Sequence, residues 1–315
     1  MAAPGPVVAI EEHYLDAEVY AIAGGARGSL GTRMRDLGAQ RLREMDEAGV
    51  DIQVLSHAPP GLQRVPAASA ADVARRANDR LAEVVAAHPT RFAAFASLPT
   101  AVPDAAAGEL ERAVRELGFK GAMIHGTTDG LFLDDARFWP ILERAEALDV
   151  PLYIHPALPM AAVRQAYMGK YAETHPTFAT AAWGFTIETG THAMRLVLSG
   201  ALEAFPRLQL ILGHLGEGIP FLMARIDEAL SRDTPTKAFR KLFTDHFHVT
   251  TSGFFSDPAL ACCIAEMGVD RILFSIDWPF VENAPGVDWL RTFELGDADK
   301  AKIFGGNAKR LLKLA

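Results

Sequence analysis

The chain has 315 residues, of which 50% are hydrophobic and 22% charged, the composition of a folded globular protein rather than of a disordered or fibrous one. Its formal net charge of −8 at pH 7 gives no overall positive field, which argues against nucleic acid and anionic membrane surfaces as partners. No apolar run approaches the ~20 residues of a spanning helix, and the N-terminus lacks a basic start followed by an apolar core, so we expect a cytoplasmic protein.

Short apolar runs rich in β-branched residues alternate with longer segments in which apolar residues recur every three or four positions, as in βα units. In chain order the predicted strands are Val7–Glu12, Ile52–Ser56, Phe92–Ala96, Ala122–His125, Leu152–His155, Leu208–Leu212, His248–Thr251 and Ile272–Ile276. Helical spacing is clearest over residues 110–117 and 138–145. Eight strands with intervening helices predict an α/β fold, a (β/α)8 TIM barrel, formed as a single domain by residues 1–315.

Turn signals predict where several helices begin and end. Gly49, Gly118 and Gly268 each follow a predicted helix, and we expect each to end its helix in the left-handed conformation. Asp257 precedes Pro258, which predicts a helix start capped by the Asp257 side chain.

Two segments are too long for plain connections between a strand and a helix. Residues 21–37 are rich in glycine and polar side chains, and residues 157–180 follow the fifth predicted strand. Long loops in a compact domain are often lids or binding elements. We therefore expect inserted loops at the catalytic face, the alternative being exposed irregular decoration.

Side chains able to bind a metal follow several predicted strands, where barrels carry their catalytic residues. Glu11 and His13 are two apart on one strand, so their side chains point the same way. His155 and Asp277 end two other strands. A lone histidine at a strand end is more often structural, but the four together predict a mixed nitrogen and oxygen site with room for water or substrate. Zn²⁺ or Mn²⁺ suits these ligands best, and Mg²⁺ is a further candidate.

A second pair of polar residues follows the sixth predicted strand. His214 comes directly after its apolar run, and Glu217 stands three residues later, where the next helix starts. This spacing allows the carboxylate to orient the imidazole and to set its basicity. The alternative is that Glu217 only stabilises the N-terminus of that helix.

Motifs along nearly the whole chain, from residue 7 to residue 311, resemble those of the amidohydrolase superfamily, amidohydrolase 2 type. They are Ala9-Ile10-Glu11-Glu12-His13, Leu152-Tyr153-Ile154-His155-Pro156, the run from Ile211 to Gly218, Arg225-Ile226-Asp227 and the run from Leu273 to Phe280. More narrowly, they resemble the metal-dependent decarboxylase branch, which includes γ-resorcylate, 2,3-dihydroxybenzoate and 5-carboxyvanillate decarboxylases. Glu11-Glu12-His13 stands where two-metal members carry two histidines, so the resemblance implies a site for one metal ion.

The resemblance also implies roles for individual residues. Glu11, His13, His155 and Asp277 match the family's metal ligands, and His214 with Glu217 matches a catalytic pair beside them. Arg225 matches an arginine near the substrate, the alternative being a surface or subunit ion pair. Phe185 and Phe280 match residues that line a ring-binding pocket, although such aromatic residues are often plain core. Ala58 stands where relatives often have a polar side chain, which implies a different preference for ring substituents; His57 beside it has no assigned role.

These matches imply an enzyme, a metal-dependent carboxy-lyase that decarboxylates a hydroxylated aromatic acid of the benzoate type without oxidation. In this reaction Asp277 would donate a proton to the ring carbon, and His214 and Glu217 would hold a phenolic oxygen or assist the transfer. The partner is then a small aromatic carboxylic acid, and the resemblance implies a homodimer or homotetramer. Two alternatives are hydrolysis of a lactone or amide by a metal-bound water and a catalytically idle scaffold.

Overall fold

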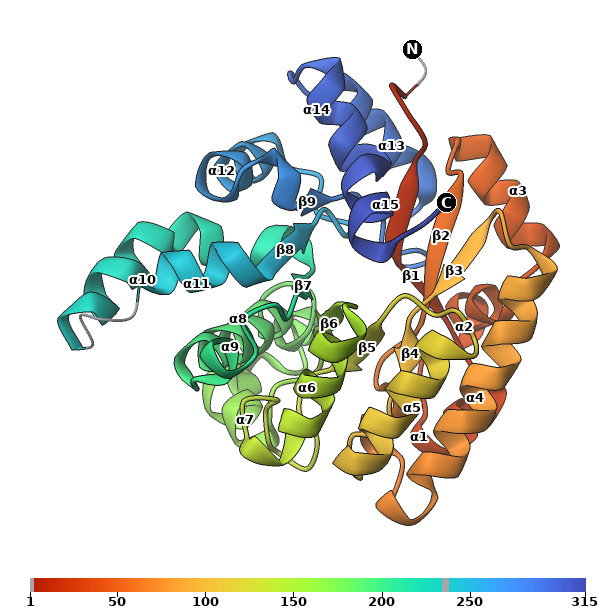
Figure 1. Cartoon of the computed structure of the whole chain (residues 1–315), viewed down its shortest axis with the longest axis horizontal. Helices are drawn as coiled ribbons and strands as arrows, with labels where there is room; N and C mark the ends of the chain where they lie inside the picture. The colour runs from red at the N-terminus through yellow and green to blue at the C-terminus, as the bar shows by residue number, and fades with distance from the viewer. Residues whose placement is uncertain (1–2, 234–237) are drawn as a thin grey trace.

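The computed structural model describes residues 3–233 and 238–315, and in it parallel strands form a ring that helices surround (Figure 1). The strands are β1 (Val8–Tyr14), β2 (Ile52–His57), β3 (Phe92–Ala94), β4 (Ala96–Ser97), β5 (Ala122–His125), β6 (Leu152–His155), β7 (Leu210–Leu212), β8 (Phe247–Thr250) and β9 (Ile272–Leu273). Each predicted strand is present, several with shifted ends. The third is divided into β3 and β4.

The ring closes at two places where the edge strands of the two sheets meet, here called seams. Hydrogen-bonded neighbours run β1-β2-β3 in one sheet and β4-β5-β6-β7-β8-β9 in the other. At the first seam, the Phe95 N–H donates to the Leu55 carbonyl at 2.9 Å, so the interrupted third strand still contacts β2. At the second, the His13 N–H donates to the Trp278 carbonyl at 2.7 Å and the Asp277 N–H to the Glu11 carbonyl at 3.0 Å. The fold is therefore the predicted (β/α)8 barrel.

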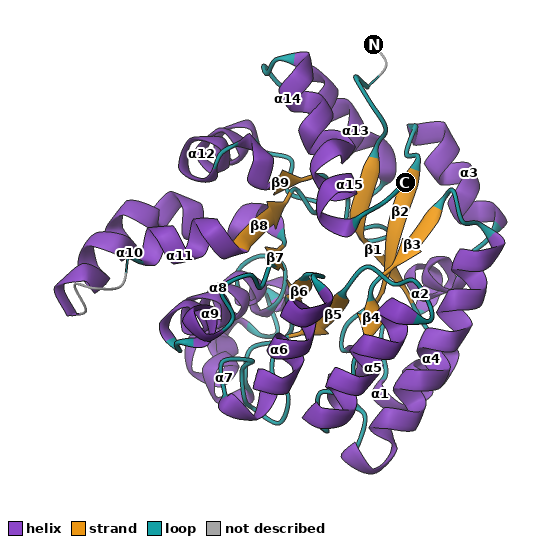
Figure 2. Ribbon diagram, in the orientation of Figure 1, coloured by secondary structure: helices purple, strands orange, loops and turns teal. Residues whose placement is uncertain are grey.

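Helices occupy the outside of the ring, and loops connect them to the strands (Figure 2). They are α1 (Ala17–Ala23), α2 (Gly28–Arg35), α3 (Ala39–Ala48), α4 (Ala67–Ala87), α5 (Pro103–Arg115), α6 (Trp139–Leu148), α7 (Ala161–Met168), α8 (Gly184–Leu198), α9 (Ala201–Ala204), α10 (Ile219–Asp233), α11 (Phe239–His246), α12 (Asp257–Met267), α13 (Asn283–Thr292), α14 (Asp297–Ala301) and α15 (Asn307–Leu312). None of the described helices combines the length and the apolar character that crossing a membrane requires.

Alternation along the strands separates two apolar cores. On β6, Leu152 and Ile154 belong to the large cluster between the strands and the helices. Tyr153, between them, belongs to a smaller cluster that fills the barrel interior. Ala308 and Leu312 of α15 pack into the same interior cluster, so α15 covers the end of the barrel at which the strands begin.

The turn signals were correct in part. Gly49 ends α3 in the left-handed conformation, with φ 73° and ψ 38°, as predicted. Gly118 also has a positive φ, 74°, two residues beyond the cap of α5. Gly268 has φ 80° but ψ 152°, which is not left-handed helical, so that prediction was wrong. The capping role of Asp257 was also wrong, because Asp257 is the first residue of α12 and its carboxylate accepts a hydrogen bond from the Trp289 indole at 2.6 Å.

The two long segments contain helices. Residues 21–37 include the end of α1 and all of α2. Residues 157–180 include α7 and two 3-10 turns, Gly169–Tyr171 and Pro176–Ala179. They are therefore ordered insertions in the barrel and not irregular loops.

Candidate metal centre

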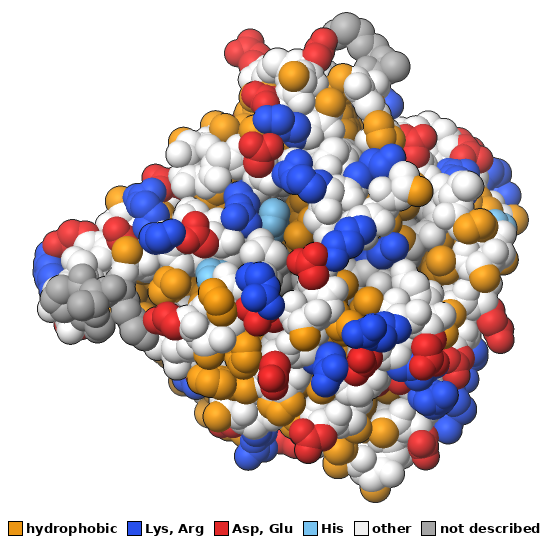
Figure 3. Space-filling view, in the orientation of Figure 1, with side chains coloured by type: hydrophobic (Ala, Val, Ile, Leu, Met, Phe, Trp, Pro, Cys, Tyr) orange, Lys and Arg blue, Asp and Glu red, His pale blue; other side chains and the backbone are white. Residues whose placement is uncertain are grey.

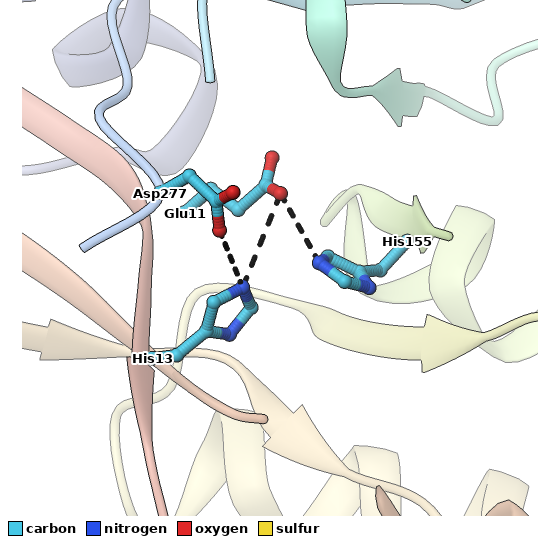
Figure 4. A group of neighbouring side chains, drawn as sticks. All are labelled: Glu11, His13, His155 and Asp277. Atoms are coloured by element: carbon cyan, nitrogen blue, oxygen red, sulfur yellow. Dashed lines mark ion pairs between the residues drawn. The ribbon is translucent and has the colours of Figure 1, made fainter. Parts of the chain in front are cut away.

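Four side chains from three parts of the barrel converge at its mouth (Figure 4). Glu11 and His13 come from β1, His155 ends β6, and Asp277 follows β9. Each offers one ligand atom, and the four atoms all lie within 4.8 Å of one another. Glu11 Oε1 is 3.1 Å from His155 Nε2, and Asp277 Oδ1 is 3.2 Å from His13 Nε2. The structure thus brings together all four residues that the sequence suggested.

The atoms that face one another have no hydrogen-bond partner of their own. Glu11 Oε1, His13 Nε2 and Asp277 Oδ1 are buried and unpartnered within the described part of the chain. The other carboxylate oxygen of Glu11, Oε2, does have partners, because it accepts hydrogen bonds from the hydroxyls of Tyr153 and Ser252. Buried polar atoms without a partner are costly and need an explanation, and a cation at their centre would supply one.

Hydrogen bonds on the far side set the tautomer of His155. Its Nδ1 lies 2.8 Å from the Pro156 carbonyl, which can only accept, so this nitrogen carries the proton. The lone pair of Nε2 is then free to face Glu11. Nδ1 also lies 3.0 Å from His125 Nδ1, while His125 Nε2 lies 2.8 Å from the His57 carbonyl. His125 therefore donates from Nε2 and can accept from His155.

The donor set fits one divalent metal ion. Ligand atoms held about 2.0–2.2 Å from a common ion lie about 3–4.5 Å apart, which agrees with the spacing within 4.8 Å. Burial lowers the pKa of His13 to about 4, so its imidazole is neutral, the form that binds metals. Two ionised carboxylates would balance a charge of +2, and a set of two carboxylates and two imidazoles suits Zn²⁺ or Mn²⁺.

The two carboxylates at the centre differ in acidity. Burial raises the pKa of Glu11, but the neighbouring imidazoles of His155, His214 and His13 outweigh burial and hold that pKa well below the usual range. Burial and then the charge of Glu11 raise the pKa of Asp277 to about 8, against the opposing effect of His214 and His155. Close carboxylates titrate in separate steps, and Asp277 is the one that holds a proton more readily.

His214 and Glu217 form a pair beside Asp277. The backbone of His214, Leu215 and Glu217 is left-handed, with φ values of 51°, 53° and 52°, which is unusual for residues other than glycine. This turn places His214 Nδ1 2.9 Å from Glu217 Oε1, while His214 Nε2 is 4.0 Å from Asp277 Oδ2. Burial lowers the pKa of His214, but the charge and hydrogen bond of Glu217 raise it to about 10. The geometry therefore favours an orienting carboxylate over a group that serves only the helix.

Glu12 lies between two of the ligands on β1 and fixes the segment that carries Asp277. Its carboxylate accepts from the backbone N–H of Ile276 at 3.0 Å and of Trp278 at 3.2 Å, the residues on either side of Asp277. Asp277 itself has a left-handed backbone, with φ 71°. The Arg41 guanidinium stacks 3.9 Å from the centre of the Trp278 ring. Contacts on both flanks thus hold Asp277 in a conformation that it would rarely adopt alone.

A cavity of about 600 Å³ opens over the cluster. His155, His214 and Asp277 line it together with Phe185 and Phe280. Both long insertions border it, through Ala23, Gly25, Ala26, Leu30, Ala157, Leu158 and Thr180. The insertions therefore shape the cavity, and the alternative of exposed decoration does not hold.

Two residues that the sequence suggested for substrate binding lie elsewhere. Arg225 is exposed on α10, a helix that extends away from the ring, and does not line the cavity. Ala58 is buried against Leu15 and Met34 and does not line the cavity either, although the two prolines after it do. Neither residue lines the cavity of its own chain, and the roles of both in substrate binding stay predictions.

Three residues that belong to the site were not expected from the sequence. His125 ends β5 and lines the cavity, so the rule that singled out His155 would have found it. Tyr153 lies two positions before His155 on β6, which places both side chains on the same face of the strand. Ser252, just after β8, gave no comparable signal.

Comparison with known proteins agrees with this geometry. A family profile described as Amidohydrolase matches residues 15–314. The γ-resorcylate decarboxylase of Polaromonas sp. (strain JS666) is 42% identical, over 98% of each chain. A solved dihydroxybenzoic acid decarboxylase from Polaromonas sp. JS666, with bound manganese and the inhibitor 2-nitroresorcinol, is 40% identical with a TM-score of 0.91, over 98% of this chain and 97% of that one. The 5-carboxyvanillate decarboxylase of Sphingomonas paucimobilis is 34% identical with a TM-score of 0.91, over 98% of this chain and 99% of that one.

Proposed function

The chain belongs to the amidohydrolase family, and we propose from its metal centre that it is a carboxy-lyase acting on a hydroxylated aromatic acid without oxidation. The observation that carries this proposal is the cluster of Glu11, His13, His155 and Asp277 at the floor of a cavity that Phe185 and Phe280 also line. Relatives that are 40–42% identical over nearly the whole chain are named as decarboxylases of resorcylate or dihydroxybenzoic acid.

The cavity has the size and lining for one aromatic ring. Its volume of about 600 Å³ lies within the ~300–1,000 Å³ of common small-molecule sites. Phe280 contacts the edge of the His13 ring, with 5.7 Å between ring centres, so an aromatic surface adjoins the cluster. A divalent ion, held there by Glu11, His13, His155 and Asp277, would supply positive charge that offsets the negative charge of an acidic phenolic substrate.

Asp277 is the proton donor in this proposal. Without a metal ion, burial and the charge of Glu11 raise its pKa to about 8, so Asp277 takes up a proton more readily than Glu11 does, which is the property that a general acid needs. Asp277 protonates the ring carbon that bears the carboxylate, which breaks aromaticity. The bond between that carbon and the carboxylate then breaks, its electron pair restores the aromatic ring, and carbon dioxide leaves.

His214 supports this proton transfer from beside the cavity. With its pKa raised to about 10, it is an imidazolium at neutral pH. Glu217 holds its Nδ1, so Nε2–H is left to donate to a phenolic oxygen of the substrate. A fixed donor at this position stabilises negative charge on that oxygen.

Three further properties belong to the proposal. The metal is Mn²⁺ or Zn²⁺, with Mg²⁺ as a third candidate; manganese in the Polaromonas enzyme favours the first. The protein forms a homodimer or homotetramer, which the exposed Phe221 and Leu222 on α10 support. We expect a cytoplasmic location from the sequence alone.

The reaction class is tested with the metal-loaded protein and four acids: 2,6-dihydroxybenzoate, 2,3-dihydroxybenzoate, salicylate and 5-carboxyvanillate. We expect carbon dioxide release from at least one of them and, in heavy water, one deuterium on the ring carbon that carried the carboxylate. Turnover of a lactone or amide, with no carbon dioxide from any aromatic acid, would instead assign the centre to hydrolysis.

Asp277→Asn tests the proton donor. We expect kcat to fall at least about 100-fold, because the general acid is lost, while elemental analysis still finds metal on the three remaining ligands. Glu109→Gln is the matched control, since Glu109 is a buried carboxylate that pairs with Arg112 outside the cavity. Full activity of Asp277→Asn would rule out this role.

A further inference from the structure

A second cavity lies at the opposite end of the barrel from the metal centre. Its volume is about 390 Å³. It is lined by residues that precede or begin β6, β7, β8 and β9 and by residues of α15 and the C-terminus: Ala145, Asp149, Val150, Pro151, Arg207, Gln209, His248, Asp270, Arg271, Arg310, Leu311 and Lys313. On the face shown in Figure 3, Lys and Arg side chains gather where β8, β9 and α15 lie in Figure 1.

Positive charge exceeds negative charge in this lining. It contains four basic side chains, from Arg207, Arg271, Arg310 and Lys313, and two carboxylates, from Asp149 and Asp270. Lys313 pairs with Asp149 at 2.6 Å, and Arg310 approaches Asp270 only to 3.9 Å. Arg207 pairs at 3.6 Å with Glu146, outside the lining. Within the described ranges, Arg271 forms no ion pair.

Arg271 is held in place on one side only. Its Nη1 donates to Gln209 Oε1 at 2.8 Å and to His248 Nε2 at 3.1 Å. Both acceptors are uncharged. The Gln209 side chain is an amide, and burial and the charges of Arg271 and Arg310 lower the pKa of His248 to about 3, so its imidazole is neutral. Nε and Nη2 of Arg271 have no hydrogen-bond partner among the described residues. The guanidinium is therefore ordered in advance, with donors to spare.

The charge on Arg271 also lacks compensation. The side chain is partly buried, and burial followed by the charge of Arg310 lowers its pKa, against the effect of Asp245. Asp245 is itself paired with Lys241 at 2.5 Å. Keeping a partly buried guanidinium beside a second one is unfavourable unless an anion joins them.

We propose that this cavity binds a small oxyanion, a phosphate or a carboxylate, through Arg271 and Arg310. The flat fork of an arginine matches two oxygens of either group. Val150, Pro151 and Leu311 add an apolar wall, so the cavity accepts an anion with a short carbon skeleton as well as an inorganic one. The site is independent of the metal centre and of the reaction catalysed there.

The proposal is tested by calorimetric titration of the metal-loaded full chain at low ionic strength, with inorganic phosphate in one series and succinate in the other. We expect one of these anions to bind and Arg271→Gln to weaken that binding at least about tenfold, as the loss of a charge-assisted pair predicts. Arg43→Gln is the matched control, because Arg43 is exposed on α3 and does not line the cavity; its affinity should equal that of the unaltered protein.

Arg310→Gln keeps the test decisive if the partly buried Arg271 is needed for folding. Arg310 is 58% exposed, so its replacement should leave the thermal transition unchanged and still weaken binding about threefold. The anion that depends on both arginines identifies the ligand as a phosphate or a carboxylate. The absence of binding by both probes, or binding that neither substitution weakens, would overturn the proposal. Anion binding at the metal would persist in all variants and is thereby distinguished.

Discussion

Three side chains at the site are fixed by a contact on the atom that faces away from the metal position. Hydroxyl groups hold Glu11, the Pro156 carbonyl holds His155, and Glu217 holds His214. Partners of this kind orient ligands, fix tautomers and tune basicity. Close approach of the backbone is also required, because a Cβ at Gly213 would lie 3.0 Å from Glu11 Oε2.

Glu217→Gln should change how activity depends on pH. The pKa of His214 is raised from its ordinary value of 6.5 to about 10, so the imidazolium form, and the stability that it contributes, is complete below about pH 6.5 and is lost as the pH rises through 10. Without the Glu217 charge, burial remains and lowers that pKa. We expect the alkaline limb of the kcat profile to move to lower pH, because His214 then loses its proton at or below neutral pH, before Asp277 does.

The pH profile of each protein is recorded with the same metal, since a bound cation acts on His214 equally in both. Glu109→Gln should leave the profile where it is, because Glu109 lies outside the cavity. An unchanged alkaline limb in Glu217→Gln would show that Glu217 does not set the charge of His214.

At the residue scale, the ligands were predictable because barrels carry their functional residues at the carboxyl ends of the strands. A residue that follows a predicted strand is therefore expected at the barrel mouth. Glu11, His13, His155 and Asp277 all lie at or just after a strand end. The exposed position of Arg225, outside the cavity of its own chain, was not predictable in this way. Helix periodicity says which residues share a face of a helix but not which face borders the cavity.

At the scale of elements, the positions of the strands and of the two insertions followed from the sequence, but the helices inside the insertions did not. Residues 24–31 contain four glycines, which disfavour a helix, and yet α2 starts at Gly28. Tertiary packing decides the outcome, since Met34 of α2 is fully buried against Leu15 and Ala58. The division of the third strand at Phe95 was likewise not predicted, because Phe92 to Ala96 is one continuous apolar run in the sequence.

The start of α8 positions the cavity wall, which Gly184→Ala tests. A Cβ at Gly184 would lie 2.2 Å from the Ala179 carbonyl oxygen, so the backbone must move, and Phe185 with it. We expect a loss of about 1–3 kcal/mol in the free energy of unfolding and a raised KM, with the metal content unchanged. Chemical denaturation, steady-state kinetics and elemental analysis measure these three effects.

Gly108→Ala is the control for that substitution. Gly108 is exposed in the middle of α5, and a Cβ there meets nothing within 4 Å. The change should stabilise the protein by about 0.5–1 kcal/mol, because alanine is the better helix former, and should leave KM alone. If Gly184→Ala leaves KM unchanged, the start of α8 does not contribute to substrate binding.

At the scale of the whole molecule, a metal ion would join β1, β6 and the segment after β9. We expect a chelator to lower the melting temperature by several degrees, because saturating metal at about one hundred times its Kd contributes about 2.7 kcal/mol. Calorimetry with and without chelator measures the shift. His155→Ala should melt at a lower temperature and respond much less to chelator, because one of its ligands is missing. A chelator effect of equal size in both proteins would mean that the stabilising metal binds elsewhere.

The second seam of the barrel, between β1 and the segment after β9, affects the order in which the chain folds during its synthesis. Glu12 bonds to the backbone of Ile276 across 264 positions of sequence, and the same seam brings Asp277 to Glu11. Contacts between such distant residues form late and slow the folding of a domain. A nascent chain released only as far as α12 holds Glu11, His13 and His155 without their fourth partner, so the complete ligand set is assembled only after synthesis has passed residue 277. Capture of the ion in its final geometry is therefore expected to be one of the last events in the maturation of this protein.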